Sequence, residues 1–490
     1  MNMQLSKKTL VNIQPQAELI TPSANVFELP EKVLQFGTGV LLRGLPDYFI
    51  DKANRQGIFN GRVVIVKSTA SGGTDAFQQQ DGLFTQVIKG IENGKEVSEK
   101  VINASVSRVL SAKEDWKQIF DCASNKEMQI IISNTTEVGI QMADDKIGGD
   151  EAPPSFPGKL LAFLYERFKV FNGSSESGMV IIPTELIVDN GKKLKSIVIA
   201  MAENNKLSAE FIQWLNEAND FCSSLVDRIV PGKLPADEQK AIENELGYSD
   251  ELMIMSECFR LWAIESGSER VKDILSFAKA DKGVVIAADI EKFRELKLRL
   301  LNGTHTFSCG LANLAGFTTV KEAMQDKKFN AFVSDLSKKE IAATISGDSI
   351  SYAEAETFAQ SVLDRFSNPH LDHKWISIAV QFTSKMKMRN IPLLVKHYSK
   401  SSEVPVNMAL GFAAYLLFMK KTIETNTSLQ DDNIGYITEN WLDDATKTYV
   451  QNVLADEQFW GVSLAAMNGF ADAVTTNVEQ LQKEGAIQTV

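Results

Sequence analysis

The sequence predicts a two-domain α/β protein, with a Rossmann-like domain of mostly parallel sheet over residues 1–288 and an all-helical domain over residues 289–490. In the first part, short apolar segments alternate with helix-patterned stretches, which is typical of a parallel sheet covered by helices on both faces. From about Glu291 onward the pattern is helical. A chain of 490 residues, 44% of them hydrophobic, is long enough to bury two separate cores.

The expected strands of the first domain are short, mostly apolar runs of the length of a buried strand. They cover residues 33–36, 63–66, 129–133, 179–182 and 284–287. After the first of them, Leu42, Leu45 and Phe49 recur at helical spacing and predict a helix that ends near Gly57. Two further helices are expected at residues 157–171 and 211–219.

The second domain is expected to consist of helices joined by short loops. The predicted helices cover residues 320–332, 352–366, 369–388, 408–418, 437–454 and 457–481. Pro369, Pro392 and Pro405 lie at helix boundaries, where proline is tolerated. The most polar, linker-like stretch is residues 426–433.

Composition and charge exclude several kinds of partner. The net charge of −12 argues against nucleic acid, whose phosphates require a basic surface, and against an anionic membrane surface. No segment approaches the roughly 20 apolar residues of a membrane span, and the N-terminus has no apolar signal region. The cysteines have no CxxC spacing, which predicts reduced thiols in a cytoplasmic protein. They are Cys122, Cys222, Cys258 and Cys309.

The sequence predicts no metal site. Of the four histidines, only His370 and His373 are close enough in sequence to form a candidate ligand pair. They follow Asn368-Pro369, a good N-cap and first-turn proline, so we expect an exposed first turn of a helix there instead.

A glycine turn follows the first predicted strand and opens the first predicted helix. In this context Gly37-Thr38-Gly39 is typical of a dinucleotide site, because glycines let the backbone approach a pyrophosphate at a helix N-terminus. Leu42 replaces the third glycine of the usual pattern, and a turn that merely needs glycine is the alternative. Arg43 would supplement phosphate binding or lie on the surface.

The end of the second predicted strand bears on the choice of cofactor. A carboxylate that binds the ribose is usual there, but this chain has Lys67 and Ser68. Lys67 would suit a 2′-phosphate and so indicates NADP. The alternative is that the backbone or the loop of residues 68–74 holds the adenosine ribose.

Residues 297–305, Lys-Leu-Arg-Leu-Leu-Asn-Gly-Thr-His, are the strongest candidate for a catalytic segment. Asn302 and Gly303 both weaken a helix relative to alanine. On an unbroken α-helix His305 would lie roughly 80° around from Lys297 and about 60° from Asn302. One loosened turn would therefore aim an amine, an amide and an imidazole at one point, as proton transfer to and from an oxygen requires. The segment also lies where the two domains join, and domain boundaries favour small-molecule sites.

A purely structural interpretation of this segment is also open. Lys297 would then belong to a solvated basic face with Arg294 and Arg299, and Glu295 would support Arg299 at the i,i+4 spacing. Asn302 and Gly303 would end a helix, and His305 would be an ordinary half-buried histidine.

Five motifs, taken in order, resemble those of the mannitol dehydrogenase family, which comprises metal-independent, long-chain dehydrogenases of polyols and sugar acids. Residues 181–187 with Asn190-Gly191, and residues 221–230, are most similar to members that interconvert tagaturonate and altronate in hexuronate breakdown. The motifs are Gly37-Thr-Gly-x-x-x-Arg43, Gln80-Asp81-Gly82-Leu83-Phe84-Thr85, Ser133-Asn-Thr-Thr-Glu137-x-Gly139, Leu225-Val-Asp227-Arg228-Ile229 and Lys297-x4-Asn302-x2-His305.

The resemblance implies a role for each residue of the last motif. Lys297 is the general acid/base. Asn302 donates to the carbonyl oxygen as negative charge develops there, and His305 binds the adjacent hydroxyl. Lys385 matches a substrate-contact lysine and would bind the carboxylate of a sugar acid.

The same resemblance indicates further substrate and cofactor residues. Glu185 and Asp227 are expected near the substrate, although Asp227 could instead end a helix or pair with Arg228. Relatives that act on neutral polyols carry asparagine where this chain has Leu186 and arginine where it has Ser377. The implied cofactor is NAD, with NADP left open. The residues implied to hold it are Gln35, Gly37, Thr38, Gly39, Val40, Leu41, Arg43, Asp81, Thr136 and Glu137.

The expected function is therefore metal-independent, NAD-dependent hydride transfer between tagaturonate and altronate in the cytoplasm, with a small sugar acid as the only partner predicted. The alternatives are the corresponding reaction of fructuronate and mannonate, oxidation of a neutral polyol, or an inactive dinucleotide-binding sensor. A sensor would have no need of a proton-transfer lysine, which favours an enzyme. The sequence leaves the substrate's stereochemistry and the oligomeric state open.

Overall fold

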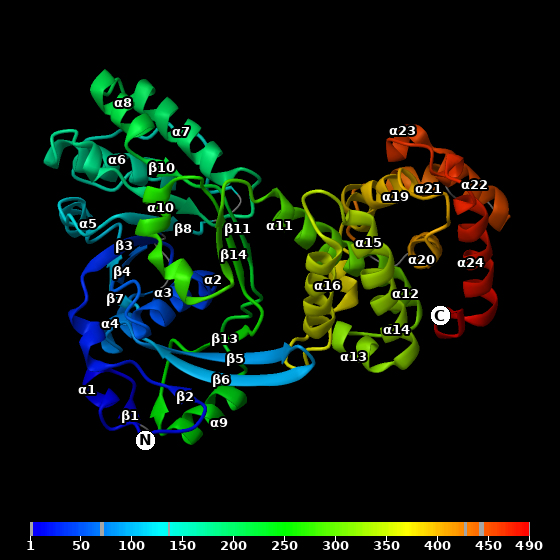
Figure 1. Cartoon of the computed structure of the whole chain (residues 1–490), viewed down its shortest axis with the longest axis horizontal. Coiled ribbons are helices and arrows are strands. Elements are labelled where there is room, and N and C mark those ends of the chain that lie inside the picture. The colour runs from blue at the N-terminus through cyan, green and yellow to red at the C-terminus, as the bar shows by residue number, and fades with distance from the viewer. Residues whose placement is uncertain (1–2, 69–72, 136–137, 426–428, 441–444, 490) are drawn as a thin grey trace. The chain divides into compact units, whose positions relative to one another are not determined.

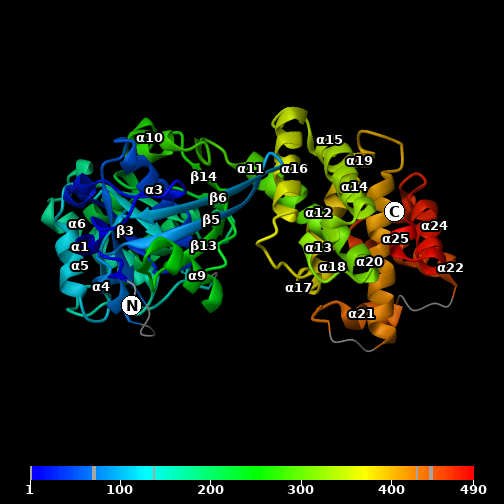
Figure 2. The same ribbon diagram turned by 90° about the horizontal axis from the view of Figure 1, so that it is seen from below.

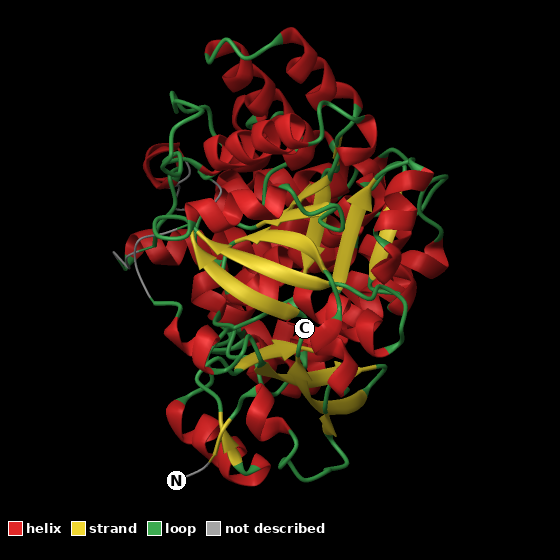
Figure 3. Cartoon of the chain, turned by 90° about the vertical axis from the view of Figure 1, so that its left-hand side faces the viewer, coloured by secondary structure: helices red, strands yellow, loops and turns green. Residues whose placement is uncertain are grey.

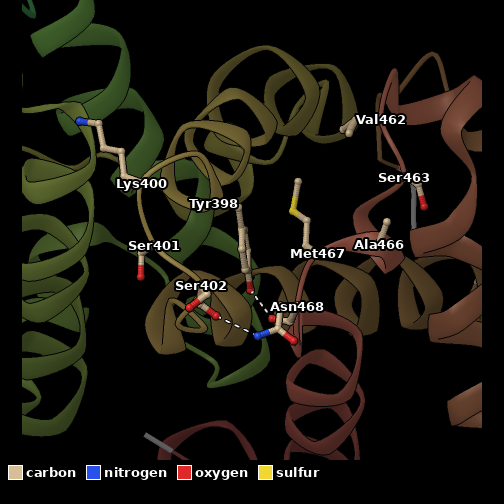
Figure 4. A pocket seen from close by; sticks show the side chains of 9 residues that line it. All are labelled: Tyr398, Lys400, Ser401, Ser402, Val462, Ser463, Ala466, Met467 and Asn468. Atoms are coloured by element: carbon tan, nitrogen blue, oxygen red, sulfur yellow. Dashed lines mark hydrogen bonds between the residues drawn. The ribbon is translucent and has the colours of Figure 1, made fainter.

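The computed structural model describes residues 3–68, 73–135, 138–425, 429–440 and 445–489 (Figure 1). The chain forms two compact units. The first comprises Met1–Lys89 and Val97–Ile290, and the second comprises Gly90–Glu96 and Glu291–Val490. The first unit contains the sheets (Figure 3), and the second is built of helices, apart from the hairpin tip (Figure 1). The predicted fold class, a Rossmann-like domain followed by a helical domain, is confirmed.

The main sheet of the first unit has six strands, and every pairing within it is parallel. Successive residues of its strands face opposite sides, so Val63 and Ile65 join one core while Val64 and Val66 join another. Burial of both faces explains the nearly continuous apolar runs of the sequence. In sheet order the strands are β10 (Asp220–Phe221), β9 (Val180–Pro183), β8 (Ile130–Ser133), β3 (Glu31–Phe36), β4 (Arg62–Lys67) and β7 (Val106–Ser111).

Helices cover both faces of this sheet (Figure 1). Those of the first unit are α1 (Lys7–Leu10), α2 (Val40–Gly44), α3 (Pro46–Arg55), α4 (Asp75–Gln79), α5 (Trp116–Ala123), α6 (Phe156–Val170), α7 (Asn190–Asn204), α8 (Ala209–Glu217), α9 (Ala236–Leu246) and α10 (Glu269–Ile274). Short 3₁₀ turns are η1 (Ala24–Glu28), η2 (Ser175–Ser177) and η3 (Ser276–Ala280). In the ranges described, no helix of either unit is both long and apolar enough to span a membrane.

Three smaller sheets complete the first unit. One has the order β13 (Ile254–Glu257), β5 (Phe84–Glu92), β6 (Lys95–Asn103) and β2 (Leu19–Ile20). Another has the order β11 (Ser224–Asp227), β14 (Leu261–Glu265) and β15 (Val284–Ala287), and β1 (Met3–Gln4) pairs with β12 (Tyr248–Ser249). All five predicted strands exist, but residues 284–287 belong to the three-stranded sheet and not to the main one.

The hairpin of β5 and β6 was not predicted. Its turn is Asn93-Gly94, with both φ angles positive (53° and 72°), as a two-residue type I′ turn requires. The tip, Gly90–Glu96, belongs to the second unit, where the backbone N–H of Asn93 donates to Asp364 Oδ2 at 2.7 Å. The alternating pattern of a hairpin is weaker than the apolar runs of the parallel strands, which is why only the latter were identified.

The second unit packs around two buried helices, α12 (Thr304–Leu314) and α20 (Val406–Glu424) (Figure 2). Gly310 and Gly411 lie at their contact. A Cβ on Gly310 would be 2.7 Å from backbone atoms of Ala414, and one on Gly411 would be 2.7 Å from Phe307 O. The two backbones therefore approach too closely for any larger residue at these positions.

The remaining helices of the second unit surround this pair. They are α11 (Glu291–Glu295), α13 (Val320–Gln325), α14 (Lys327–Asp335), α15 (Ala342–Ile345), α16 (Tyr352–Phe366), α17 (Trp375–Ile378), α18 (Phe382–Lys385), α19 (Ile391–Tyr398), α21 (Ile434–Asn440), α22 (Thr446–Ala455), α23 (Glu457–Trp460), α24 (Phe470–Glu484) and α25 (Ala486–Thr489). Three segments are π-helical, η4 (Leu296–Gly303), η5 (Leu336–Ile341) and η6 (Met386–Asn390), and η7 (Leu464–Ala466) is a 3₁₀ turn.

Several predicted helices are interrupted in the structure. The prediction of one helix over residues 369–388 is wrong, because residues 369–374 are not helical and the rest forms α17, α18 and part of η6. His370 and His373 therefore lie in a loop and not in a first helical turn. The predicted helix 457–481 is split between Gly461 and Gly469, both of which have positive φ.

Candidate active site

The segment that carries Lys297 and Asn302 is the π-helix η4. In a π-helix the N–H of residue i+5 bonds to the C=O of residue i. Lys297 and Asn302 are five residues apart, so the widened turn brings them to the same side, whereas an α-helix would set them about 140° apart. Both side chains are half-buried. The predicted loosened turn is confirmed, and the alternative that Asn302 and Gly303 end a helix is wrong, because α12 continues directly.

A second π-helix, η6, is bonded to the first. Asn390 Nδ2 donates to Gly303 O at 3.1 Å, and Arg299 Nη1 donates to Met388 O and Arg389 O at 2.9 and 2.7 Å. Arg299 also pairs with Glu295 at 3.1 Å, the predicted i,i+4 contact. Arg299 is thus a structural crosslink and does not belong to a solvated basic face. These bonds hold the backbone that carries Lys297 and Asn302.

His305 lies in the first turn of α12 with only 9% of its surface exposed. Its ring stacks on Phe366, with centroids 3.9 Å apart and an interplanar angle of 12°. Trp375 and His373 contact it edge-on, at 5.9 and 5.2 Å between centroids. His305 is buried, so the alternative of an ordinary half-buried histidine is wrong.

The environment keeps the His305 imidazole neutral. Burial, and then the positive charges around it, hold its pKa well below the usual range. The basic neighbours, in order of their effect, are His373, Arg365, Arg389 and Lys385. Nε2 is buried and has no hydrogen-bond partner among the described residues. A neutral imidazole with an unused nitrogen can bind a substrate hydroxyl.

Lys385 is the last residue of α18. Its Nζ donates to Ile378 O at 2.8 Å, and its side chain is half-buried. Burial and then the nearby charge of Arg389 lower its pKa. Lys385 therefore lies in the same positive cluster as His305, within the second unit.

The glycine turn lies at the carboxyl end of β3, in the first unit. Gly37 has a φ of +130°, and a Cβ there would be 2.9 Å from Leu42 Cδ1 and 3.0 Å from Asn134 O. Gly39 is the N-cap of α2, without a side-chain cap, and a Cβ there would meet nothing within 4 Å. Gly37 is thus required by the backbone, whereas Gly39 leaves open space beside it for a ligand. Thr38, Val40 and Leu41 complete the turn and are half-buried.

The side chain of Gln35 holds this turn by hydrogen bonds. Its Nε2 donates to Gly37 O at 3.4 Å and to Asp47 Oδ2 at 3.3 Å. Both Gln35 Oε1 and Asp47 Oδ1 are buried and have no partner in the described residues. Burial raises the pKa of Asp47 to about 7, which allows a proton on this carboxyl near neutral pH.

The structure shows that Arg43 and Asp81 make contacts within the protein. Arg43 is buried, donates from Nη1 to Leu252 O at 2.6 Å and lies over the rings of Phe77 and Phe84. The alternative that Arg43 is a surface residue is wrong. Asp81 is exposed, and its Oδ2 accepts from the backbone N–H of Lys7 at 2.8 Å. Thr136 and Glu137, also predicted to bind the cofactor, lie outside the described residues.

Glu185 also makes structural contacts. Its Oε1 accepts from Thr135 N at 2.8 Å and from Thr135 Oγ1 at 2.9 Å, and Oε2 accepts from Ser133 Oγ at 3.2 Å. It thereby ties the end of β9 to the end of β8. The neighbouring Leu186 is 63% exposed and offers no side-chain donor.

Asp227 is buried at the last position of β11, so the alternative of a helix-end residue is wrong. Arg228 donates instead to Gly44 O at 2.7 Å and to Glu257 O at 2.9 Å, so the alternative pairing of Asp227 with Arg228 is also wrong. Asp227 and Glu185 belong to the first unit, whereas Lys297, Asn302, His305 and Lys385 belong to the second.

Two domains of one family match the chain. Residues 31–274 match the Mannitol dehydrogenase Rossmann domain, and residues 289–482 match the Mannitol dehydrogenase C-terminal domain. The chain belongs to the mannitol dehydrogenase family. The predicted resemblance and the predicted enzyme class, a dehydrogenase, are thereby confirmed.

A curated relative supports this assignment, and two solved structures are similar in fold. Altronate oxidoreductase of Bacillus subtilis (strain 168) is 37% identical over 463 residues, which are 94% of each chain. A D-sorbitol dehydrogenase in substrate-free form is similar in fold, with a TM-score of 0.78 at 18% identity over 99% of this chain and 100% of that one. Pseudomonas fluorescens mannitol 2-dehydrogenase, solved with NAD and D-mannitol, has a TM-score of 0.66 at 20% identity over 99% and 98% of the two chains.

Sequence reasoning missed three basic residues around His305 in this member of the mannitol dehydrogenase family. They are Arg365 at the end of α16, His373 in the following loop and Arg389 in η6. For Arg389 a signal existed, because residues 385–390 contain three basic residues and no acidic one. Arg365 and His373 carry no such signal, since only tertiary packing brings them to α12.

Proposed function

We propose that this protein is an NAD-dependent oxidoreductase that interconverts tagaturonate and altronate, with Lys297 as general acid/base. The observation that carries the proposal is the π-turn, which places an amine and an amide on one side of a helix that continues into a buried, neutral His305. The 37% identity to an altronate oxidoreductase over 94% of the chain supports the substrate.

A bound nicotinamide dinucleotide supplies the hydride for reduction and accepts it in oxidation. In reduction, protonated Lys297 gives its proton to the ketone oxygen as that oxygen becomes an alkoxide. The Asn302 amide donates a hydrogen bond to the same oxygen and stabilises the developing charge. His305 Nε2 binds a neighbouring hydroxyl and orients the sugar. In oxidation, neutral Lys297 takes the hydroxyl proton, so the same residue serves both directions.

The glycine turn fits such a cofactor. The open space beside Gly39, next to an uncapped helix start, admits a pyrophosphate, and Thr38, Val40 and Leu41 would lie beside it. Lys67, which would suit the 2′-phosphate of NADP, is only 8% exposed, and this supports NAD. Gln35 would then act on the cofactor indirectly, by holding the glycine turn. Arg43 and Asp81 would also act indirectly, through their contacts within the protein.

The proposed reaction takes place in the cytoplasm. The four cysteines, all of which lie in described parts of the chain, form no disulfide and are buried, which fits a reducing compartment.

The test is a panel of substrates with both nicotinamide cofactors. Oxidation of NADH and of NADPH is followed on mixing the purified protein with tagaturonate, fructuronate and fructose in turn. The proposal expects the largest kcat/KM with tagaturonate and NADH. A preference for fructuronate or fructose would reassign the substrate, and NADH binding without turnover of any of them would indicate a sensor.

A further inference from the structure

The second unit contains a cluster of basic side chains around His305. Four of them, His373, Arg365, Arg389 and Lys385, lower the pKa of His305. Burial and then the charge of Arg389 lower the pKa of Lys385, so the two cations repel one another, and the charge of Asp431 offsets part of this effect. Like charges held together in a partly desolvated place are unfavourable unless an anion joins them.

Arg389 is the least compensated member of this cluster. Its Nη1 donates to Thr306 Oγ1 at 3.3 Å, and Thr306 directly follows His305. Its Nε is buried and has no hydrogen-bond partner within the described ranges. Among the residues that the structure describes, no carboxylate pairs with Arg389, and burial is the sole cause that lowers its pKa.

The backbone of Arg389 is held firmly in place. Its carbonyl oxygen accepts from Arg299 at 2.7 Å, and the next residue, Asn390, donates to Gly303 O at 3.1 Å. The guanidinium is therefore positioned relative to η4, which carries Lys297 and Asn302. A fixed, half-buried cation without a counter-ion costs stability in the absence of a ligand, whereas a bound carboxylate would compensate it.

We infer that Arg389 binds the carboxylate of the sugar-acid substrate and so selects acids over neutral polyols. This inference rests on the proposed function and adds to it a residue that determines specificity. Lys385, a second member of the cluster, binds the same carboxylate. His305 is neutral and binds a hydroxyl. The carboxylate and the sugar hydroxyls are therefore recognised by different side chains.

The test compares binding of an acid and its neutral counterpart. With NADH bound, altronate and altritol form complexes that cannot react, so calorimetry measures their affinities without turnover. In Arg389→Gln the affinity for altronate should fall about 10- to 100-fold, as loss of a charged hydrogen bond predicts. The affinity for altritol should change by less than about threefold, and Arg389→Lys should recover part of the loss for altronate.

Lys387→Gln is the matched control. It removes one positive charge from the same π-helix, but its Nζ lies over the Phe459 ring at 3.7 Å, and it is absent from the charges that act on His305. Lys387→Gln should leave altronate affinity unchanged. Equal losses for altronate and altritol in Arg389→Gln would mean a structural role through Thr306, and an unchanged altronate affinity would overturn the inference outright.

The two proposals fail in different ways. If the unmodified protein neither turns over tagaturonate nor binds altronate, the proposed function is wrong. If the unmodified protein does both, and Arg389→Gln does so equally well, only the role of Arg389 is wrong. Thermal unfolding of each variant shows whether a loss of binding comes from a loss of folding.

Discussion

At the scale of single residues, the site depends on three side chains whose chemistry is set by their surroundings. The π-turn aligns Lys297 with Asn302, and aromatic packing on Phe366 buries the imidazole of His305. An imidazole kept neutral beside several cations cannot itself hold the proton of the reaction. This supports the proposal that the amine of Lys297 transfers the proton.

Replacement of Lys297 by alanine should lower kcat for tagaturonate reduction by about 100- to 10,000-fold, the usual contribution of a general acid. NADH affinity should stay nearly unchanged, because the amine acts on the substrate. Steady-state kinetics and titration of NADH fluorescence measure the two quantities. Lys292→Ala in the preceding helix, where Lys292 pairs with Glu354, is the control. An undiminished kcat in Lys297→Ala would show that another group moves the proton.

Replacement of Lys385 by alanine should mainly raise KM for tagaturonate, by about tenfold or more, since a charged contact to the carboxylate is lost. The effect on kcat should be small, because this contact exists in both the ground state and the transition state. Steady-state kinetics at saturating NADH make the comparison. A fall in kcat at constant KM would remove Lys385 from carboxylate recognition.

At the scale of elements, two departures from regular structure form the candidate sites. One is the pair of π-helices, η4 and η6, joined by side-chain bonds to backbone carbonyls. The other is the turn at the carboxyl end of β3, where Gly37 needs a positive φ and Gly39 does not. Both depart from ideal geometry where chemistry is expected, as irregular turns in functional sites commonly do.

The two glycines of the turn should respond differently to alanine. Gly39→Ala should fold normally, because its φ of −62° is ordinary and its Cβ meets nothing within 4 Å, but NADH affinity should fall at least about tenfold as the methyl group takes space needed by the cofactor. Gly37→Ala should lower the melting temperature, since its Cβ would lie 3.0 Å from Asn134 O. Melting curves and NADH titrations separate the two effects. Unchanged NADH binding in Gly39→Ala would place the cofactor elsewhere.

At the scale of the whole molecule, the stability of the first unit should depend on buried carboxyl groups. Asp47 accepts a hydrogen bond from Gln35, which also bonds to the glycine turn. Burial raises the pKa of Asp47 to about 7. The folded protein therefore binds a proton there that the unfolded chain releases above the ordinary pKa of an aspartate. Stability from this group is fully present at low pH and is lost as pH rises through about 7.

Asp47→Asn should remove this pH dependence. Between about pH 5 and about pH 7 the free energy of unfolding of the unmodified protein should lose about 1 kcal/mol per pH unit relative to the variant. The variant should therefore gain relative stability toward pH 8. Denaturant unfolding at several pH values measures the difference in the free energy of unfolding between the two proteins. The contributions of the other buried carboxyl groups are the same in both proteins and cancel in this difference. A difference that does not vary with pH would mean that Asp47 stays ionised in the folded protein.

The sequence by itself determined the fold class, the five strands, the glycine turn and the loosened turn that carries Lys297 and Asn302. These are local signals, since apolar periodicity, glycine spacing and a helix-weakening Asn-Gly pair depend on neighbours in the chain. The interruption of residues 369–388 and the hairpin of β5 and β6 are less visible, because they depend on packing as much as on propensity.

Only the tertiary structure decided where the charged side chains lie. Arg43 and Glu185 looked like ligand-binding residues, yet in the fold Arg43 lies over two aromatic rings and Glu185 bonds to the end of a neighbouring strand. His373 looked in sequence like half of a possible ligand pair and Arg389 like part of a short basic run, yet the fold places both around His305. Burial and charge neighbourhood arise from contacts between residues far apart in the chain, and local sequence patterns carry no record of them.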